Sequence, residues 1–177
     1  MSDSVKYDKY YEDDPWVCGD PYPEFVEFFT RHISEPVQVL DLGCGQGRDS
    51  LFIARLGHSV LGVDVSEVGV RQLLEAARRE RLDIDAVVAD ASRFKSRNKF
   101  DVVLLDRVVH MLSDAVDQKR LLRTAERLTR KNGFLLIADT KRNRETIRSF
   151  FCGDASEWSI VRRRGDFLCL RKDGGAT

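Results

Sequence analysis

The sequence predicts an α/β fold in which seven strands form a mostly parallel sheet that ends in an antiparallel β-hairpin. Two observations lead to this prediction. Short apolar runs alternate with stretches of helical periodicity until five strands are counted, as in a parallel sheet wound with right-handed crossovers. Near the end of the chain, two strand-like runs flank Arg164 and Gly165, as in a hairpin. The 177 residues are enough to bury the core of one domain.

The first half of the chain supplies three strands, which we expect at residues 37–40, 58–63 and 84–89. A helix over residues 46–56 follows the first strand and stops at Gly57. A second helix is expected to start after the cap residue Ser66 and to run as far as Arg81.

The second half supplies four strands. Residues 100–105 are almost wholly apolar, which suits a central parallel strand covered on both faces. A helix over residues 115–130 is expected to stop at Asn132 and Gly133, ahead of a fifth strand at residues 134–138. The two hairpin strands are expected at residues 157–163 and 166–171.

The composition excludes several classes of protein. Lys and Arg number 29, as do Asp and Glu, so the net charge is zero and a dedicated nucleic-acid binder is disfavoured. The four cysteines form no CxxC or Cys/His cluster, so we expect reduced thiols and no metal site. No apolar run approaches the roughly 18 residues of a membrane span, and the first residues lack signal-peptide features. We therefore expect a cytoplasmic protein with no membrane partner.

The charge is unevenly distributed. Residues 1–30 hold eight acidic and two basic side chains, a net charge of −6, whereas residues 118–177 hold fifteen basic and seven acidic ones, a net charge of +8. Either these segments attract one another or the basic segment guides anions. We expect residues 1–30 to form a lid that belongs to the same domain as residues 31–177.

A glycine-rich turn is the most informative feature. Gly43, Gly45 and Gly47 follow the first strand and precede a helix, where glycines let the backbone turn sharply and a ligand approach it closely. Asp64 ends the second strand, and a carboxylate in that position can accept hydrogen bonds from both hydroxyls of a ribose. Together they indicate a ligand that contains adenosine.

The glycine spacing separates two classes of cofactor. A dinucleotide site with the spacing GxGxxG would need a third glycine where Arg48 stands. The stretch Asp41-Leu-Gly-Cys-Gly-Gln-Gly47 instead resembles the nucleotide loop of class I S-adenosylmethionine-dependent methyltransferases. The resemblance covers about residues 7–171 and implies a Rossmann-like three-layer sandwich, S-adenosyl-L-methionine as cofactor and S-adenosyl-L-homocysteine as product.

The resemblance also implies roles for individual residues. Asp64 would hold the ribose, Asp90 and Ala91 would lie beside the adenine, and Asp106 would lie beside the methionine part. The full set of implied cofactor-binding residues is Asp41, Gly43, Gly45, Gly47, Asp64, Val65, Asp90, Ala91, Asp106 and Trp16.

Within this family, the chain is most similar to the tellurite-resistance and thiopurine methyltransferase-like branch. The similarity rests on residues 45–51, on residues 56–60, and on residues 7–11 followed by Pro15 and Trp16. The fourth strand is followed by Asp106-Arg-Val-Val-His110 rather than by the Asn/Asp-Pro-Pro-Tyr/Phe motif of enzymes that methylate planar amines. The expected function is methyl transfer to a small molecule, with a thiol, an oxyanion or a metalloid as acceptor.

Asp41 and Asp90 each keep two interpretations. Asp41 would either organise the loop by accepting backbone N–H bonds or contact the methionine amino group. Asp90 would either lie beside adenine or cap a helix. Cys44 is expected to be a small packing residue.

Three residues are candidates for a catalytic role. His110 would be a general base or a structural histidine, and Arg107 would bind an anionic substrate or pair with a nearby acid. Tyr11, like Trp16, would either fasten the N-terminal segment to the core or close over the sulfonium through a cation–π contact.

Three other functions stay open at this point. The chain could be an RNA or protein methyltransferase that uses its basic C-terminal part, a nicotinamide-dependent oxidoreductase, or a non-catalytic cofactor-binding partner of another enzyme. The sequence specifies neither the acceptor atom nor the oligomeric state.

Overall fold

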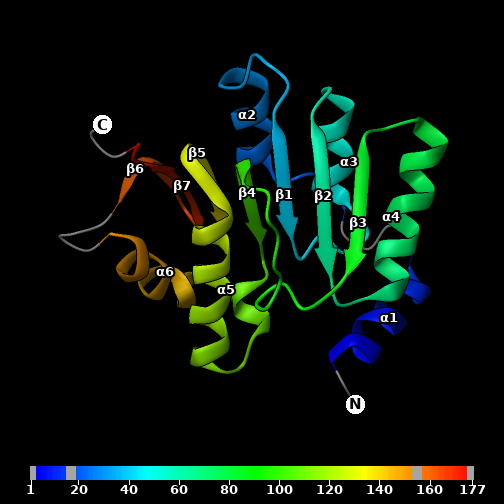
Figure 1. Ribbon diagram of the computed structural model, residues 1–177. Helices are drawn as coiled ribbons and strands as arrows, with labels where there is room; N and C mark the ends of the chain where they lie inside the picture. Colours follow the sequence, from blue (N-terminus) through cyan, green and yellow to red (C-terminus); the bar gives the residue numbers. More distant parts are fainter. Residues whose placement is uncertain (1–2, 15–18, 153–156, 175–177) are drawn as a thin grey trace. The chain divides into compact units, whose positions relative to one another are not determined.

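A computed structural model describes residues 3–14, 19–152 and 157–174 of the chain, with the side chains of residues 3–6 excepted. The chain divides into two compact units, Met1–Ala91 and Ser92–Thr177. Each unit contains its own set of hydrogen-bonded strands (Figure 1).

The first unit contains a parallel sheet of three strands in the order β3-β2-β1. The strands are β1 (Gln38–Leu42), β2 (Ser59–Asp64) and β3 (Ile84–Val88), and the helices are α1 (Asp3–Asp13), α2 (Pro23–Arg31), α3 (Arg48–Arg55) and α4 (Glu67–Glu80). The three strands and the two helices expected between them are confirmed, with boundaries that move by one or two residues.

Local sequence explains where α4 begins and ends. The hydroxyl oxygen of Ser66 accepts a hydrogen bond of 3.0 Å from the backbone N–H of Gly69, as expected for the cap residue. Arg81 takes a left-handed conformation at the other end (φ +57°). The buried residues of α4 recur at helical spacing and include Val70, Leu73 and Ala77.

Residues 1–30 form two helices with different roles. Helix α2 buries Phe25, Phe28 and Phe29, of which Phe25 is fully buried, so it is part of the core of the first unit. Helix α1 lies beside the N-terminal end of α4 (Figure 1). Residues 1–30 therefore include one helix that is part of the core and one that packs against α4.

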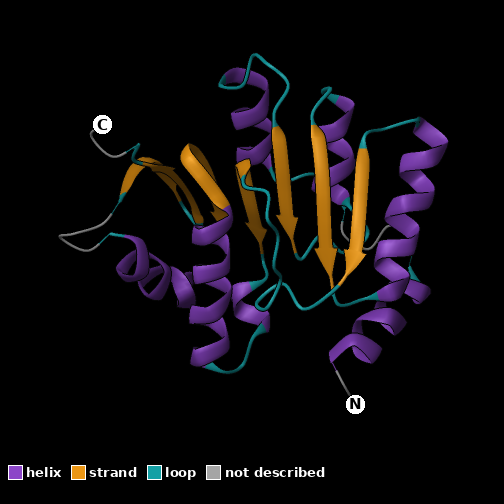
Figure 2. Cartoon of the chain, viewed as in Figure 1, coloured by secondary structure: helices purple, strands orange, loops and turns teal. Residues whose placement is uncertain are grey.

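The second unit contains four strands in the order β4-β5-β7-β6. The strands β4 (Phe100–Asp106) and β5 (Thr129–Ala138) are parallel, and β7 (Phe167–Lys172) pairs antiparallel with both β5 and β6 (Trp158–Arg164). The helical elements are η1 (Val109–Met111), α5 (Ala115–Leu128), η2 (Lys141–Asn143) and α6 (Arg144–Phe151), as Figure 2 shows. The predicted C-terminal hairpin is confirmed.

The expected helix stop at Asn132 and Gly133 is wrong. Helix α5 ends at Leu128, and β5 begins at Thr129, so both residues lie inside the strand. The pairing with β4 jumps from Thr129 opposite Phe100 to Phe134 opposite Val102, which marks a bulge. Asn132 has a φ of +62°, and a Cβ on Gly133 would lie 2.8 Å from the carbonyl oxygen of Asp101. The dipeptide therefore forms the bulge rather than a helix stop.

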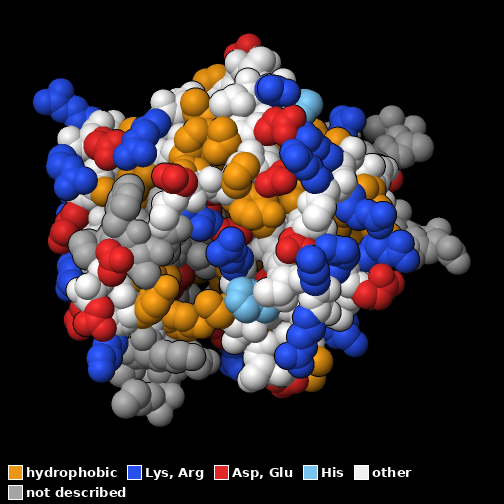
Figure 3. Space-filling model, turned by 180° about the vertical axis from the view of Figure 1, so that it is seen from behind, with side chains coloured by type: hydrophobic (Ala, Val, Ile, Leu, Met, Phe, Trp, Pro, Cys, Tyr) orange, Lys and Arg blue, Asp and Glu red, His pale blue; other side chains and the backbone are white. Residues whose placement is uncertain are grey.

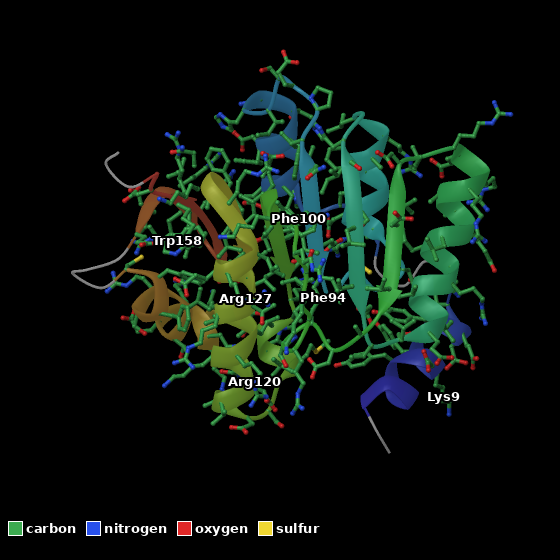
Figure 4. All side chains as sticks on the ribbon, viewed as in Figure 1. Lys9, Phe94, Phe100, Arg120, Arg127 and Trp158 are labelled. Atoms are coloured by element: carbon green, nitrogen blue, oxygen red, sulfur yellow. The ribbon has the colours of Figure 1, made fainter. Side chains whose placement is uncertain are left out.

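Basic side chains of the second unit form ion pairs and hydrogen bonds within the same unit. Arg130 pairs with Asp101 at 2.6 Å, and Arg144 pairs with Asp166 at 2.7 Å. A guanidinium nitrogen of Arg127 donates to the backbone carbonyl of Phe94 at 2.7 Å; both residues are labelled in Figure 4. Basic and acidic side chains are interspersed over the face drawn in Figure 3. The excess of positive charge is thus partly neutralised locally.

Candidate functional site

The glycine-rich loop joins β1 to α3 and turns through three glycines with positive φ. These angles are +87° at Gly43, +51° at Gly45 and +83° at Gly47, a region that favours glycine. The backbone N–H groups of Gly43 and Cys44 both donate to the carbonyl oxygen of Val63, at 2.7 and 3.2 Å. The loop is therefore fastened to the end of β2.

Gly47 is required by packing as well as by its backbone angle. A Cβ at this position would lie 2.2 Å from Cδ1 of Leu73, a buried residue of α4. The absence of a side chain lets the start of α3 pack directly against α4.

Asp64 lies at the carboxyl end of β2, as predicted, and contacts the glycine loop. Its Oδ2 accepts a hydrogen bond of 2.8 Å from the N–H of Gly45, and its Oδ1 accepts one of 2.9 Å from the N–H of Ser66. Burial raises the pKa of Asp64, and the backbone hydrogen bonds partly oppose this rise. Each carboxylate oxygen can accept more than one hydrogen bond, so the Asp64 carboxylate can still accept hydrogen bonds from the two hydroxyls of a ribose.

Asp41 is buried beneath the loop. Its carboxylate accepts a hydrogen bond of 2.6 Å from the hydroxyl of Ser50. Burial, and secondly the charge of Asp49, raise the pKa of Asp41 to about 7. Among the described residues its hydrogen-bond partner is this side chain and not the backbone amides of the first of its two interpretations.

Helix α1 lies against the glycine loop through Tyr11. A Cβ on Gly45 would come within 2.5 Å of the Tyr11 hydroxyl oxygen, and one on Gly69 would come within 3.1 Å of the Tyr11 ring. The ring of Tyr11 thus occupies a slot between two glycines, and this arrangement supports its role in fastening α1 to the core.

Asp8 provides a second attachment of α1. Its Oδ1 accepts hydrogen bonds from the hydroxyl of Ser66 at 2.5 Å and from the backbone N–H of Val68 at 3.1 Å. A carboxylate at this position also interacts favourably with the positive end of the α4 dipole.

Two glutamines hold the C-terminal end of α1. Nε2 of Gln46 donates to the carbonyl oxygen of Asp14 at 2.8 Å and to Oε1 of Gln72 at 2.9 Å. Nε2 of Gln72 donates in turn to the carbonyl oxygen of Tyr11 at 3.1 Å. These bonds satisfy carbonyls that the end of a helix leaves unpaired. They also connect Gln46, a residue of the glycine loop, to the residue that follows α1.

Asp8, Gln46 and Gln72 were not among the predicted site residues, because their partners are remote in the chain. Oε1 of Gln46 is buried and has no hydrogen-bond partner among the described residues, which leaves a free acceptor in the loop. Trp16, a candidate for fastening the N-terminal segment to the core or for closing over the sulfonium, is outside the described residues.

Asp90 and Ala91 follow β3, at the end of the first unit. Asp90 is exposed, whereas Ala91 is buried. The residues after Asp90 form a turn and not a helix, so the interpretation of Asp90 as a helix cap is wrong. Val65, next to Asp64, is partly exposed.

In the second unit, β4 ends at Asp106 and the chain turns at Arg107. Arg107 has a φ of +52°, which is unusual for a residue with a side chain, and its N–H donates to the carbonyl oxygen of Ala138 at 2.7 Å. Its side chain is exposed. The turn leads directly to η1, which contains His110.

His110 contacts the carboxylate of Asp139, the residue that follows β5. Oδ2 of Asp139 lies 3.2 Å from the backbone nitrogen of His110 and 3.4 Å from its ring Nδ1. The side chain of Asp139 is 2% exposed and that of His110 is 29% exposed. Asp139 was not among the predicted site residues, although an acidic residue at the end of a strand is the same signal that identified Asp64.

Within the described ranges, 3–14, 19–152 and 157–174, no group of His, Cys, Asp and Glu could hold a metal ion. No helix in these ranges is long and apolar enough to cross a membrane.

Residues 39–133 match the sequence model of a family described as a methyltransferase domain. The chain is 33% identical over 127 residues to the ubiquinone biosynthesis O-methyltransferase of Pelagibacter ubique, a match that covers 70% of this chain and 50% of that protein. It is 31% identical over 105 residues to TehB of Haemophilus influenzae, called a probable S-adenosyl-L-methionine-dependent methyltransferase, covering 59% of this chain and 36% of TehB. The chain thus spans half or less of the length of these relatives.

Two solved structures show the fold. The crystal structure of TehB from Haemophilus influenzae matches with a TM-score of 0.73 at 19% identity and covers 94% of this chain and 67% of that one. The N-methyltransferase NodS of Bradyrhizobium japonicum, solved with S-adenosyl-L-homocysteine, matches with a TM-score of 0.74 at 17% identity, covering 94% and 98%. These matches confirm the predicted Rossmann-like fold.

Proposed function

Because the chain belongs to the methyltransferase-domain family, which it matches over residues 39–133, we propose that the protein transfers a methyl group from S-adenosyl-L-methionine to a small-molecule acceptor. The observation that carries this proposal is the contact between the Gly45 N–H and the Asp64 carboxylate. This contact supports the proposal because a carboxylate beside a glycine loop with three left-handed residues could accept hydrogen bonds from ribose hydroxyls.

The residues of the first unit fit the cofactor. Asp64 would bind the ribose, with Val65 next to it, and Asp90 and Ala91 would lie near the adenine. Gly43, Gly45 and Gly47 would let the cofactor approach the backbone, and Gln46 offers a buried acceptor without a partner among the described residues. When bound, S-adenosyl-L-methionine supplies an electrophilic methyl group on a sulfonium, so the protein's task is to orient the acceptor and exclude water.

The other predicted site residues would shape the loop, cover the cofactor or contact the acceptor. Asp41 would shape the loop through Ser50, as its hydrogen bond supports. Tyr11 would help to cover the cofactor by holding α1 on the loop, and Trp16 would contribute to the same cover. Asp106 would contact the methionine part, Arg107 would contact the acceptor, and His110 would serve as a general base.

A small-molecule acceptor is supported by the relatives. The first of them is named for ubiquinone biosynthesis as an O-methyltransferase, and the match covers 70% of this chain. The alternative of an RNA or protein acceptor receives less support, because basic residues of the second unit pair with acids of the same unit. A nicotinamide-dependent oxidoreductase is disfavoured by the family match and by Arg48.

The proposal can be tested by measuring S-adenosylhomocysteine production from S-adenosylmethionine across a panel of phenols, thiols, oxyanions, metalloid anions and amines. We expect turnover with at least one small acceptor and none with an RNA or peptide panel. Turnover restricted to RNA or peptides would contradict the small-molecule proposal.

A further inference from the structure

Both carboxylate oxygens of Asp139 accept hydrogen bonds from neighbouring groups. Its Oδ1 accepts hydrogen bonds from the backbone N–H of Thr140 at 2.8 Å and from Nδ2 of Asn143 at 3.0 Å, and its Oδ2 accepts one from the backbone N–H of His110 at 3.2 Å. All of these groups donate, so they match a carboxylate, which only accepts. Asp139 and Asn143 are both buried.

This arrangement orients the ring of His110. Because Oδ2 of Asp139 accepts hydrogen bonds, the ring nitrogen 3.4 Å away, Nδ1, is the one that should carry the hydrogen. The lone pair then resides on Nε2, at the other side of the ring. The ring is partly exposed, so a substrate can reach it, whereas the carboxylate behind it is almost wholly buried. A histidine oriented in this way by a buried carboxylate is the usual arrangement for a general base.

We propose that Asp139 is a positioning residue that makes His110 the proton acceptor of the site, and that the methyl acceptor is therefore a hydroxyl group. This inference rests on the proposed methyltransferase function. It narrows the acceptor to a phenol or a similar protonated oxygen, in place of a thiol or an oxyanion.

The choice of a hydroxyl over a thiol or an oxyanion follows from the need for a base. A protonated amine would also need a base, and the O-methyltransferase among the relatives favours a hydroxyl over an amine. A thiol with a pKa of about 8.5 is already partly ionised near neutral pH, and an oxyanion carries no proton that must be removed. A phenol with a pKa of about 10 stays protonated and gains from a base, which typically contributes about 10²- to 10⁴-fold in rate. An oriented histidine is useful for the phenol and dispensable for the other two.

The proposed reaction balances without a further reactant. The acceptor oxygen forms a bond to the methyl carbon and gives its proton to Nε2 of His110, while the electron pair of the broken C–S bond stays on sulfur. His110 later returns the proton to solvent. Asp139 keeps its charge throughout and stabilises the imidazolium.

The tautomer of His110 can be measured without any acceptor. The chain contains three histidines, so the ¹⁵N signals of His110 are identified by their loss in His110→Gln. We expect the Nδ1–H tautomer of His110 to dominate in the wild type and to lose its dominance in Asp139→Asn, whose amide can present a donor to Nδ1. Asp114→Asn is the matched control, because Asp114 is exposed and Asn also caps helices well. An unchanged tautomer in folded Asp139→Asn would overturn the proposal.

Kinetics then test the acceptor class. With a phenol that the wild type methylates, we expect Asp139→Asn to lower kcat by about 10²- to 10³-fold, a loss within the range of general-base catalysis, and to leave the affinity for S-adenosylhomocysteine within about twofold. Turnover of thiols or oxyanions but of no hydroxyl acceptor would refute the inference and leave the proposed methyltransferase function intact. Failure of the wild type to bind S-adenosylhomocysteine would instead overturn the proposed function itself.

Discussion

The backbone N–H of Gly45 donates a hydrogen bond of 2.8 Å to Oδ2 of Asp64, nineteen residues further along the chain. This bond connects the glycine loop after β1 to the acidic end of β2. The loop conformation and the position of the carboxylate therefore depend on one another, and a change at either residue should affect cofactor binding.

The first prediction concerns Asp64. Replacing it by Asn removes the charge and turns one acceptor oxygen into a donor, so the affinity for S-adenosylhomocysteine should fall by about 1.4–2.7 kcal/mol, roughly 10- to 100-fold in Kd. Calorimetric titration measures this change. Asp85→Asn, at an exposed position of β3 in the same unit, is the control and should bind as the wild type does. Equal affinities for the two variants would show that Asp64 does not hold the cofactor.

A second prediction separates the packing of Gly47 from its backbone angle. Gly47 and Gly57 have similar φ angles, +83° and +91°, but a Cβ would clash with Leu73 only at Gly47, since nothing lies within 4 Å of one at Gly57. Both changes to Ala should cost about 1 kcal/mol of strain, and Gly47→Ala should cost about 1–3 kcal/mol more because of overpacking. Urea denaturation of both variants checks this. Equal losses would mean that the contact with Leu73 is absent in solution.

The third prediction concerns the attachment of α1. Asp8→Ala removes the acceptor of two hydrogen bonds to the start of α4, so α1 should detach more often. Amide hydrogen exchange within α1 should become about 5- to 30-fold faster, which corresponds to a loss of about 1–2 kcal/mol. Lys9→Ala, an exposed position of the same helix labelled in Figure 4, should leave exchange unchanged. If both variants exchange alike, Asp8 does not anchor the helix.

The fourth prediction concerns pH. The pKa of Asp41 is raised by burial from 3.8 to about 7 in the folded protein. Between these values the folded state binds the proton more tightly than the unfolded state does, so this residue lowers stability as the pH rises from 4 to 7. Asp41→Asn cannot ionise and should gain stability relative to the wild type over this window, at up to about 1.4 kcal/mol per pH unit. Parallel denaturation curves at pH 4.5 and 7 measure the difference, and a constant gap between the proteins would refute it.

The parts of the fold that depend on neighbouring residues could be predicted from the sequence. The strands, the glycine loop and the position of Asp64 follow from periodicity and from glycine spacing, and both are local signals. The hairpin was likewise recognisable from two strand-like runs beside Gly165. The stop at Asn132 and Gly133 was misassigned because the same dipeptide suits a helix end and a strand bulge, and only the pairing of β5 with β4 decides between them.

The missed residues act through contacts between remote parts of the chain. Gln46 contacts Asp14 across 32 residues, and Asp8 contacts Ser66 across 58. No local pattern indicates such contacts. Asp139 is different, since its position after a strand was visible, but its pairing with His110 depends on how the turn at Arg107 returns the chain towards β5.

We expect the site to hold S-adenosylmethionine and not a dinucleotide. Calorimetric titration of the wild-type protein with S-adenosylhomocysteine and, separately, with NAD tests it most directly. We predict binding of S-adenosylhomocysteine at about one molecule per chain and no binding of NAD at the same concentrations. Binding of NAD without binding of S-adenosylhomocysteine would show that the site is a dinucleotide site.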